Sequence, residues 1–304
     1  ITLMEIINVI PRGYCQGVVR AIKIAKDTAE KYSDYPISML GMLVHNQYVV
    51  NECTHLGIHC LDDKKASRLD LLDKIDSGVV IITAHGASEE VYQKAQDKGL
   101  IVVDATCPDV MKTHVLVKEH VKDGDVIYIG KKNHPEAEGT VGLSNRIHLV
   151  TEEKDLDNLS NLHNVLITCQ TTLSLLDTNH LIQKTKEKFK DAKVAPEICN
   201  ATRIRQEAVL NLKDIDVLYV VGDPHSNNTN QLKKSAEKIG IPNAYLIENA
   251  NDIEENQIKG KNRVAVTSGS STPTALTNDV VSVLKKYAET GILDKDIPIP
   301  AHLF

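Results

Sequence analysis

Short apolar runs that end in polar turns recur along the chain, and a helical pattern follows each of them. The clearest example is Leu100–Val103, which ends at Asp104 and leads into Thr106, Cys107 and Pro108. A short apolar run bounded by turn residues is typical of a buried strand in a parallel sheet. Thr106 is a good helix cap, and proline is tolerated in a first helical turn. The pattern therefore places Cys107 between a strand and a helix, where the helix dipole favours a thiolate.

Two other cysteines, Cys15 and Cys199, stand in the same arrangement. Cys15 and Cys107 are 92 residues apart, and so are Cys107 and Cys199. A regular period of this kind indicates an internal repeat, here threefold. We therefore expect three similar small α/β units over residues 15–106, 107–196 and 197–290. We expect an N-terminal strand at 4–12 to join the third unit and a tail to follow at 291–304.

Two further apolar runs in each expected unit end in loops that are rich in polar side chains. The candidate site residues in these loops are, in chain order, His45, His85, His134, Glu136, Thr171, Ser226 and Ser271. In open α/β sheets, ligands collect at the carboxyl ends of the strands. Hydroxyl, amide and backbone N–H donors at helix starts are the groups that bind phosphate. The chain has neither a GxxxxGK[ST] loop nor a GxGxxG turn after a strand, so a nucleoside triphosphate or dinucleotide is not the expected ligand.

Composition and charge narrow the class of protein. The chain has 304 residues, 42% hydrophobic and 25% charged, with a formal net charge of −6. These values are typical of a globular protein and argue against nucleic acid or a membrane surface as the partner. No apolar run approaches the ~20 residues of a membrane span. The first ten residues lack the features of a signal peptide, so we expect a cytoplasmic protein, or one of the plastid stroma if a transit peptide was removed.

The six cysteines form no CxxC pair and no zinc-finger spacing, so reduced thiols are expected. Structural roles are expected for Cys53, Cys60 and Cys169. The three cysteines at the repeated turns could bind zinc with a fourth ligand, or an iron–sulfur cluster. Zinc cysteines usually come in close pairs, whereas iron–sulfur clusters accept ligands from distant segments. Three thiolates on a four-iron cubane would leave one iron open to a substrate oxygen.

Nine motifs, taken together, resemble those of one enzyme family. In order they are GYCQGVVRAI, VHNQYVV, AHGAS, VDATCPDVMKTH, NHPEAEGTVG, QTTLS, ICNATRIRQEAV, HSNNTNQL and SGSSTP. They resemble the motifs of the 4-hydroxy-3-methylbut-2-enyl diphosphate reductases, which complete the methylerythritol phosphate route to isoprenoids. The resemblance implies a pseudo-threefold trefoil of three α/β domains around a [4Fe–4S] cluster. It also implies reductive removal of the substrate's hydroxyl group to give isopentenyl and dimethylallyl diphosphates.

The resemblance also assigns roles to individual residues. It implies that the cluster ligands are Cys15, Cys107 and Cys199, and that Thr171 lies near the allylic hydroxyl. Glu136 would deliver protons, with Glu138 as the alternative. The implied diphosphate contacts are His45, His85, His134, Ser226, Asn227, Asn228 and Ser271. Asn227 stands where many relatives have serine, so its contact is expected through its backbone N–H. A ferredoxin or flavodoxin type protein is the expected electron donor.

Two other classes of protein fit the same residue types. An iron–sulfur dehydratase or hydratase of a phosphorylated small molecule would use the same three cysteines without net redox change. A non-enzymatic trefoil with a zinc site made of three cysteines would bind a phosphate ligand and would be colourless. Metal content and the reaction products distinguish the three hypotheses.

Overall fold

The strands of the computed structural model, which describes residues 3–300 and 303–304, form three sheets of four parallel strands each. The first sheet has the order β3 (Ile58–Leu61), β2 (Ile37–Leu40), β4 (Val79–Ile82), β5 (Ile101–Asp104). The second has the order β7 (Ile147–Val150), β6 (Val126–Ile129), β8 (Leu166–Cys169), β9 (Lys193–Val194). The third has the order β11 (Asn243–Ile247), β10 (Val217–Val221), β12 (Arg263–Ser268), β1 (Glu5–Asn8). The expected α/β class with three similar sheets is confirmed.

The three sheets share one strand order, and this order explains where the repeated cysteines lie. One edge strand of each sheet leads into a repeated cysteine. These edge strands are β5 before Cys107, β9 before Cys199 and β1 before Cys15. The third sheet takes its edge strand from the start of the chain, since β1 pairs with β12 from Glu5↔Arg263 to Asn8↔Val266. Strand β10 likewise pairs with β12 and β11, and all of these pairings are parallel.

The described residues divide into two compact units. The middle unit holds Gly17–Val44 and Cys53–Cys199, and therefore the first two sheets. The terminal unit holds the chain up to Gln16, the segment His45–Glu52, and everything from Asn200 onward, and therefore the third sheet.

Helices connect the strands within both units. The helices with residues in both units are α1 (Gln16–Lys31) and α2 (Gln47–His55). Those of the middle unit are α3 (Arg68–Leu72), α4 (Glu89–Asp97), α5 (Pro108–His120), α6 (Pro135–Val141), α7 (Leu175–Lys188) and the 3-10 turn η1 (Glu153–Asn158). Those of the terminal unit are α8 (Ala201–Leu210), α9 (Asn227–Lys238), α10 (Glu255–Ile258), α11 (Thr274–Thr290) and the 3-10 turn η2 (Ala250–Asp252). No helix in the described part of the chain is both long and apolar enough to span a membrane.

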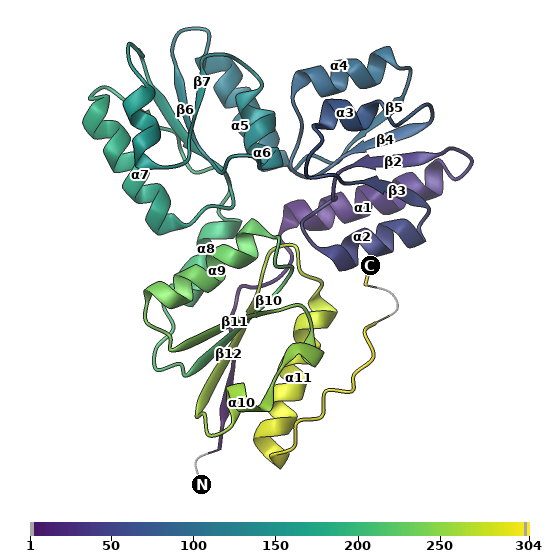
Figure 1. Cartoon of the computed structure of the whole chain (residues 1–304), viewed down its shortest axis with the longest axis vertical. Helices are drawn as coiled ribbons and strands as arrows, with labels where there is room; N and C mark the ends of the chain where they lie inside the picture. Colours follow the sequence, from purple (N-terminus) through teal and green to yellow (C-terminus); the bar gives the residue numbers. More distant parts are fainter. Residues whose placement is uncertain (1–2, 301–302) are drawn as a thin grey trace. The chain divides into compact units, whose positions relative to one another are not determined.

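The central strands of the sheets, such as β4, β6 and β10, are buried on both faces, as their continuous apolar runs predict. In β10, Tyr219 packs with α11 on one face of the sheet. Leu218 and Val220 pack with Leu232 of α9 on the other face. Figure 1 shows α11 along one side of this sheet and α8 and α9 along the other. Because both faces are covered, polar side chains remain at the strand ends, which is where ligands collect in such sheets.

One local expectation is wrong. Thr106 does not cap the helix after β5: α5 begins at Pro108, and Cys107 occupies the N-cap position. The N–H and the hydroxyl of Thr106 both donate to Asp104 Oδ1, at 2.9 and 2.5 Å. Tyr92 donates to the other carboxylate oxygen of Asp104 at 3.0 Å. Asp104 therefore organises the turn and holds Thr106 within it, one residue before the N-cap position.

Candidate functional site

Each of the three repeated cysteines lies directly before a helix, as its sequence pattern predicts. Cys15 precedes α1, Cys107 is the N-cap of α5, and Cys199 stands two residues before α8. All three are reduced thiols of intermediate exposure. A thiolate at a helix start is stabilised by the helix dipole, so each position suits a soft metal ligand. Cys15 belongs to the terminal unit, and Cys107 and Cys199 belong to the middle unit.

Of the remaining cysteines, Cys53 and Cys169 are the less suited to bind metal, since Cys53 is buried and Cys169 is largely so. Burial raises the pKa of the Cys169 thiol to about 12, which opposes thiolate formation at neutral pH. Cys53 is fully buried within α2. Its thiol hydrogen-bonds to Cys60 and lowers the pKa of that residue. These contacts agree with the structural roles expected for Cys53, Cys60 and Cys169.

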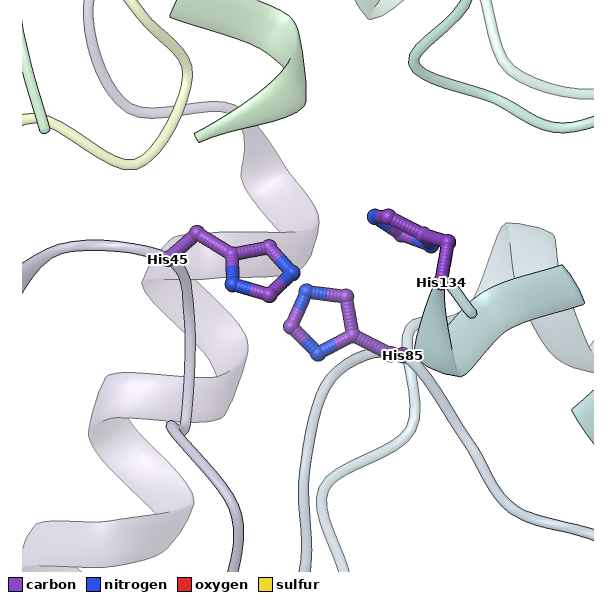
Figure 2. Close-up of side chains that lie close together, drawn as sticks. All are labelled: His45, His85 and His134. Carbon is purple, nitrogen blue, oxygen red and sulfur yellow. The ribbon is translucent and has the colours of Figure 1, made fainter. Parts of the chain in front are cut away.

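His85 and His134 lie side by side in the middle unit. Their ring centroids are 5.6 Å apart and the ring planes are inclined at 81°, an edge-to-face arrangement that Figure 2 shows. His85 follows β4, and His134 is the N-cap of α6 after β6. Gly139 of α6 faces the loop after β4, since a Cβ there would lie in van der Waals contact, at 3.4 Å, with backbone atoms of Ala87. The two imidazoles thus form one patch of polar ring atoms at the carboxyl ends of two different sheets.

The hydrogen bonds of His134 define its tautomer. Its Nδ1 atom accepts from the backbone N–H of Glu136 at 3.2 Å, as a helix cap. An accepting Nδ1 carries no proton, so the neutral ring carries its proton on Nε2. His134 can therefore donate one hydrogen bond from Nε2 to an anionic ligand without giving up its capping role.

A chain of partly buried polar groups contacts His85 at its Nδ1 atom. Arg68 donates from Nη2 to Thr83 Oγ1 at 3.0 Å, and Thr83 Oγ1 lies 3.3 Å from Nδ1 of His85. The Thr83 hydroxyl can donate to a neutral imidazole or accept from a protonated one. Desolvation lowers the pKa of Arg68, whereas the negative charge of Glu138 raises it. The chain of contacts therefore fixes the ring orientation of His85 through its Nδ1 atom.

Glu136 is a buried carboxyl group with defined partners. It is only 4% exposed, although it lies in the first turn of α6. Oε1 accepts from the backbone N–H of Thr171 at 2.9 Å, and Oε2 accepts from the Thr171 hydroxyl at 2.8 Å. Tyr128 donates to Oε1 at 3.4 Å. Burial raises the pKa of Glu136 and outweighs these hydrogen bonds, which act in the opposite direction. A buried acid with a raised pKa is typical of a proton donor.

Glu138, the alternative proton donor, differs from Glu136 in its surroundings. It is exposed on α6, two residues from the buried Glu136. An exposed carboxylate at this position is what a solvated helix surface predicts. The contrast favours Glu136 for proton transfer.

In the terminal unit, the start of α9 gathers polar side chains after β10. Ser226 is the N-cap and accepts from the N–H of Thr229 at 3.3 Å. Asn227 and Asn228 follow it and are both buried. Asn228 Oδ1 accepts from the N–H of Ser270 at 2.8 Å, which leaves its Nδ2 atom buried without a hydrogen-bond partner in the described residues. A buried amide donor at a helix start is suited to a phosphate oxygen.

Two glycines, Gly222 after β10 and Gly269 after β12, allow the loops after these strands to pack closely against the start of α9. A Cβ at Gly222 would lie 2.5 Å from Thr229 Oγ1, and one at Gly269 would collide with the same atom. Side chains at either position would push the helix start away from the loops. The two glycines therefore keep Asn228 and Ser270 in hydrogen-bond contact.

In the terminal unit, the Ser271 side chain contacts the backbone of His45. Ser271 donates from Oγ to the carbonyl oxygen of His45 at 3.0 Å. The start of α2, just after His45, is held by Asp223, whose Oδ2 accepts from the N–H of Gln47 at 2.9 Å. These bonds fix the backbone of His45 beside the SGSSTP loop. Figure 2 includes the His45 side chain.

The structure therefore brings the predicted residues together in two groups. The middle unit gathers His85, His134, Glu136 and Thr171, and the terminal unit gathers His45, Ser226, Asn227, Asn228 and Ser271. Sequence reasoning missed the residues that support these groups: Arg68, Thr83, Tyr128 and Asp223.

Together these features define a class of protein. It is an α/β protein with an internal repeat, with cysteines at helix starts and with hydrogen-bond donors suited to phosphate at the strand ends. The particular family follows from comparison. A family model described as LytB protein matches residues 6–285, and the chain belongs to this family.

Curated relatives cover almost the whole chain. A protein of Geobacillus sp. (strain WCH70) is 47% identical over 289 residues, covering 93% of this chain and 91% of its own. One of Anoxybacillus flavithermus is 44% identical over 305 residues, covering 97% and 96%. Both are named 4-hydroxy-3-methylbut-2-enyl diphosphate reductase.

Solved structures agree with the sequence comparisons. The E-1-hydroxy-2-methyl-but-2-enyl-4-diphosphate reductase from Plasmodium falciparum superposes with a TM-score of 0.86 at 34% identity, covering 94% of this chain and 89% of that one. A structure of (E)-4-hydroxy-3-methyl-but-2-enyl diphosphate reductase superposes with a TM-score of 0.66 at 31% identity, covering 93% and 100%.

Proposed function

We propose that this chain reduces (E)-4-hydroxy-3-methylbut-2-enyl diphosphate to isopentenyl diphosphate and dimethylallyl diphosphate. The curated relatives carry the name of this reductase and match the chain almost end to end. The observation that carries the proposal is the buried Glu136, which is hydrogen-bonded to Thr171 and has a raised pKa. The reaction consumes two electrons and two protons per substrate; the C–O bond breaks, one proton leaves in water, and a C–H bond forms.

The residues present fit an iron–sulfur group. Three reduced cysteines at helix starts supply three soft thiolate ligands, and Cys169 is a poor thiolate because its pKa is raised to about 12. We infer that Cys15, Cys107 and Cys199 hold a [4Fe–4S] cluster. When bound, such a cluster supplies electrons and a Lewis-acidic iron. A small iron–sulfur or flavin protein of the ferredoxin or flavodoxin type would reduce it.

The polar residues bind and orient the diphosphate end of the substrate. His134 donates from Nε2, because its Nδ1 accepts from the Glu136 N–H. Asn228 donates from the otherwise unsatisfied Nδ2 atom. His45, His85, Ser226, Asn227 and Ser271 complete the proposed set of contacts. Binding energy from a diphosphate can hold the reacting end of the substrate in place.

Glu136 and Thr171 move the protons. The neutral acid of Glu136 is retained to higher pH because burial raises its pKa. The Thr171 hydroxyl, 2.8 Å from Oε2, can accept a proton from the acid and donate one to the substrate hydroxyl. Thr171 thus links a buried proton reservoir to the reacting group.

Anaerobic purification followed by iron, sulfide and Mössbauer analysis tests this proposal. We expect about four irons and four sulfides per chain, with one iron distinct from the others. A colourless protein with one zinc would support the non-enzymatic alternative. A cluster with substrate turnover but no net electron consumption would support the hydratase alternative.

A further inference from the structure

The peptide group that enters Cys107 is held at both of its polar atoms. The N–H of Cys107 donates to the carbonyl oxygen of Ala84 at 2.9 Å. The carbonyl oxygen of the same peptide, on Thr106, accepts from Nη1 of Arg20 at 2.8 Å. All of these residues lie within the middle unit. The peptide can neither rotate nor shift without losing one of the two bonds, so the direction of the cysteine side chain is constrained.

The peptide group that enters Cys15 is held in the same way, within the terminal unit. The N–H of Cys15 donates to the carbonyl oxygen of Ser270 at 3.3 Å. The carbonyl oxygen of Tyr14 accepts from Nη2 of Arg205 at 3.1 Å, and Nε of Arg205 also donates to the carbonyl oxygen of Gly13 at 3.0 Å. Arg205 is only 6% exposed. A buried guanidinium that grips two successive carbonyls fixes this turn more firmly than a single bond would.

The two arrangements are equivalent in the repeat. Ala84 and Ser270 each lie two residues beyond corresponding strands, β4 and β12. Arg20 and Arg205 are each the fifth residue of a helix that follows a different cysteine, α1 after Cys15 and α8 after Cys199. In both places, the cysteine N–H donates to a loop carbonyl oxygen, and the preceding carbonyl oxygen accepts from an arginine.

The third helix of this set differs. The fifth residue of α5, which follows Cys107, is Lys112, and it forms an ion pair with Asp109 of its own helix at 3.1 Å. The arginine is therefore present at two of the three equivalent helix positions. Lysine lacks the planar fork that can grip two carbonyls at once.

We propose that Arg20 and Arg205 are positioning residues for the iron–sulfur group: each clamps the peptide that enters a ligand cysteine, and each brings its positive charge to the residue directly before that cysteine. This inference rests on the proposed cluster ligation by Cys107 and Cys15. Fixed ligand directions favour retention of the cluster, as outer contacts of metal ligands commonly do. The positive charges stabilise the more negative, reduced cluster and thereby raise its reduction potential.

The chain offers matched controls for both arginines. Arg203 lies on the same helix as Arg205 but pairs with Glu207 at 3.0 Å, where both side chains are partly exposed. Lys23 lies on the same helix as Arg20 and pairs with the exposed Asp27 at 2.5 Å. Arg203→Gln and Lys23→Gln remove the same formal charge from the same helices, so general effects of charge or helix stability appear in them as well.

The experiment compares these variants with Arg20→Gln, Arg205→Gln and Arg205→Lys after reconstitution with ferrous iron and sulfide under anaerobic conditions. It measures the loss of visible absorbance in a chelator and the reduction potential of the bound cluster. We expect Arg20→Gln and Arg205→Gln to lose the cluster about 10–100 times faster than the wild type and to show a more negative potential. We expect Arg205→Lys to retain the potential, because it keeps the charge, and still to lose the cluster faster.

The outcomes separate this inference from the proposed function. If the wild type takes up no iron and sulfide, both fail. If the wild type binds the cluster but the glutamine variants match Arg203→Gln and Lys23→Gln in both measurements, only the inference fails. Full retention in Arg205→Lys would contradict the forked clamp. Because Arg205 is buried and its variant can fail to fold, Arg20→Gln at the partly exposed site is the deciding variant.

Discussion

Replacing Glu136 with glutamine is the most specific test of the chemistry, because the structure allows glutamine to keep the local contacts. The amide oxygen can accept from the Thr171 N–H, now 2.9 Å from Oε1, and the amide NH2 can donate to the Thr171 hydroxyl, now 2.8 Å from Oε2. The variant therefore loses the transferable proton and little else. Loss of a general acid lowers the rate by ~10²–10⁴, which corresponds to about 3–5 kcal/mol in the barrier.

The assay is turnover with a chemical reductant under anaerobic conditions, with iron content and substrate affinity measured in parallel. We expect Glu136→Gln to keep its iron and its affinity while turnover falls. Glu138→Gln is the matched control, since Glu138 is exposed on the same helix. Near-normal turnover in Glu136→Gln, together with a collapse in Glu138→Gln, would refute the assignment and transfer the role to Glu138.

The same substitution predicts a change in the pH dependence of stability. Burial raises the pKa of Glu136 above its ordinary value of 4.5, so the folded protein holds this proton more tightly than the unfolded chain. Its contribution to the free energy of unfolding is therefore fully present below that ordinary value and is lost as pH rises through the raised pKa. Glutamine cannot ionise, so Glu136→Gln should gain stability relative to the wild type as pH rises. A difference in melting temperature that stays constant from about pH 4 to 8 would contradict the raised pKa.

Three other features of the sites can be tested by single substitutions. Cys107→Ser should lose the cluster and the activity while Cys169→Ser keeps both, by iron analysis; equal loss in Cys169→Ser would refute the ligand assignment. Asn228→Ala should weaken binding of inorganic diphosphate by about one to two decades, or roughly 1.5–3 kcal/mol, by calorimetry; unchanged affinity would count against this contact. Gly269→Ala should lower the free energy of unfolding by about 1–3 kcal/mol, since the new Cβ would collide with Thr229 Oγ1; a neutral result would mean that α9 can shift.

Much of the fold could be predicted because its signals are local. The apolar runs of β4, β6 and β10 and the polar loops after them are visible in the sequence, and the spacing of 92 residues reveals the repeat. The turns at the three cysteines follow from the same pattern. The domain boundaries proposed from the repeat stay a prediction.

The supporting contacts could not be predicted because they join distant segments. Arg205 donates to the carbonyl oxygen of Gly13, and Arg68 donates to the hydroxyl of Thr83. Nothing near either arginine in the sequence identifies its partner. The error at Thr106 has a local cause: Asp104, two residues earlier, accepts from the N–H and the hydroxyl of Thr106 and holds that residue in the turn before the helix. Composition and spacing do not predict such a turn, whereas the three-dimensional structure shows it.

Product analysis with a measured supply of electrons shows whether the protein is a reductase. The anaerobically purified protein is mixed with (E)-4-hydroxy-3-methylbut-2-enyl diphosphate and a limiting, known amount of a one-electron reductant, and the products and the electrons consumed are counted. We expect isopentenyl and dimethylallyl diphosphates, with two electrons consumed for each molecule formed. A hydrated or isomerised product formed without electron consumption, or unchanged substrate with a fully loaded cluster, would contradict the proposed function.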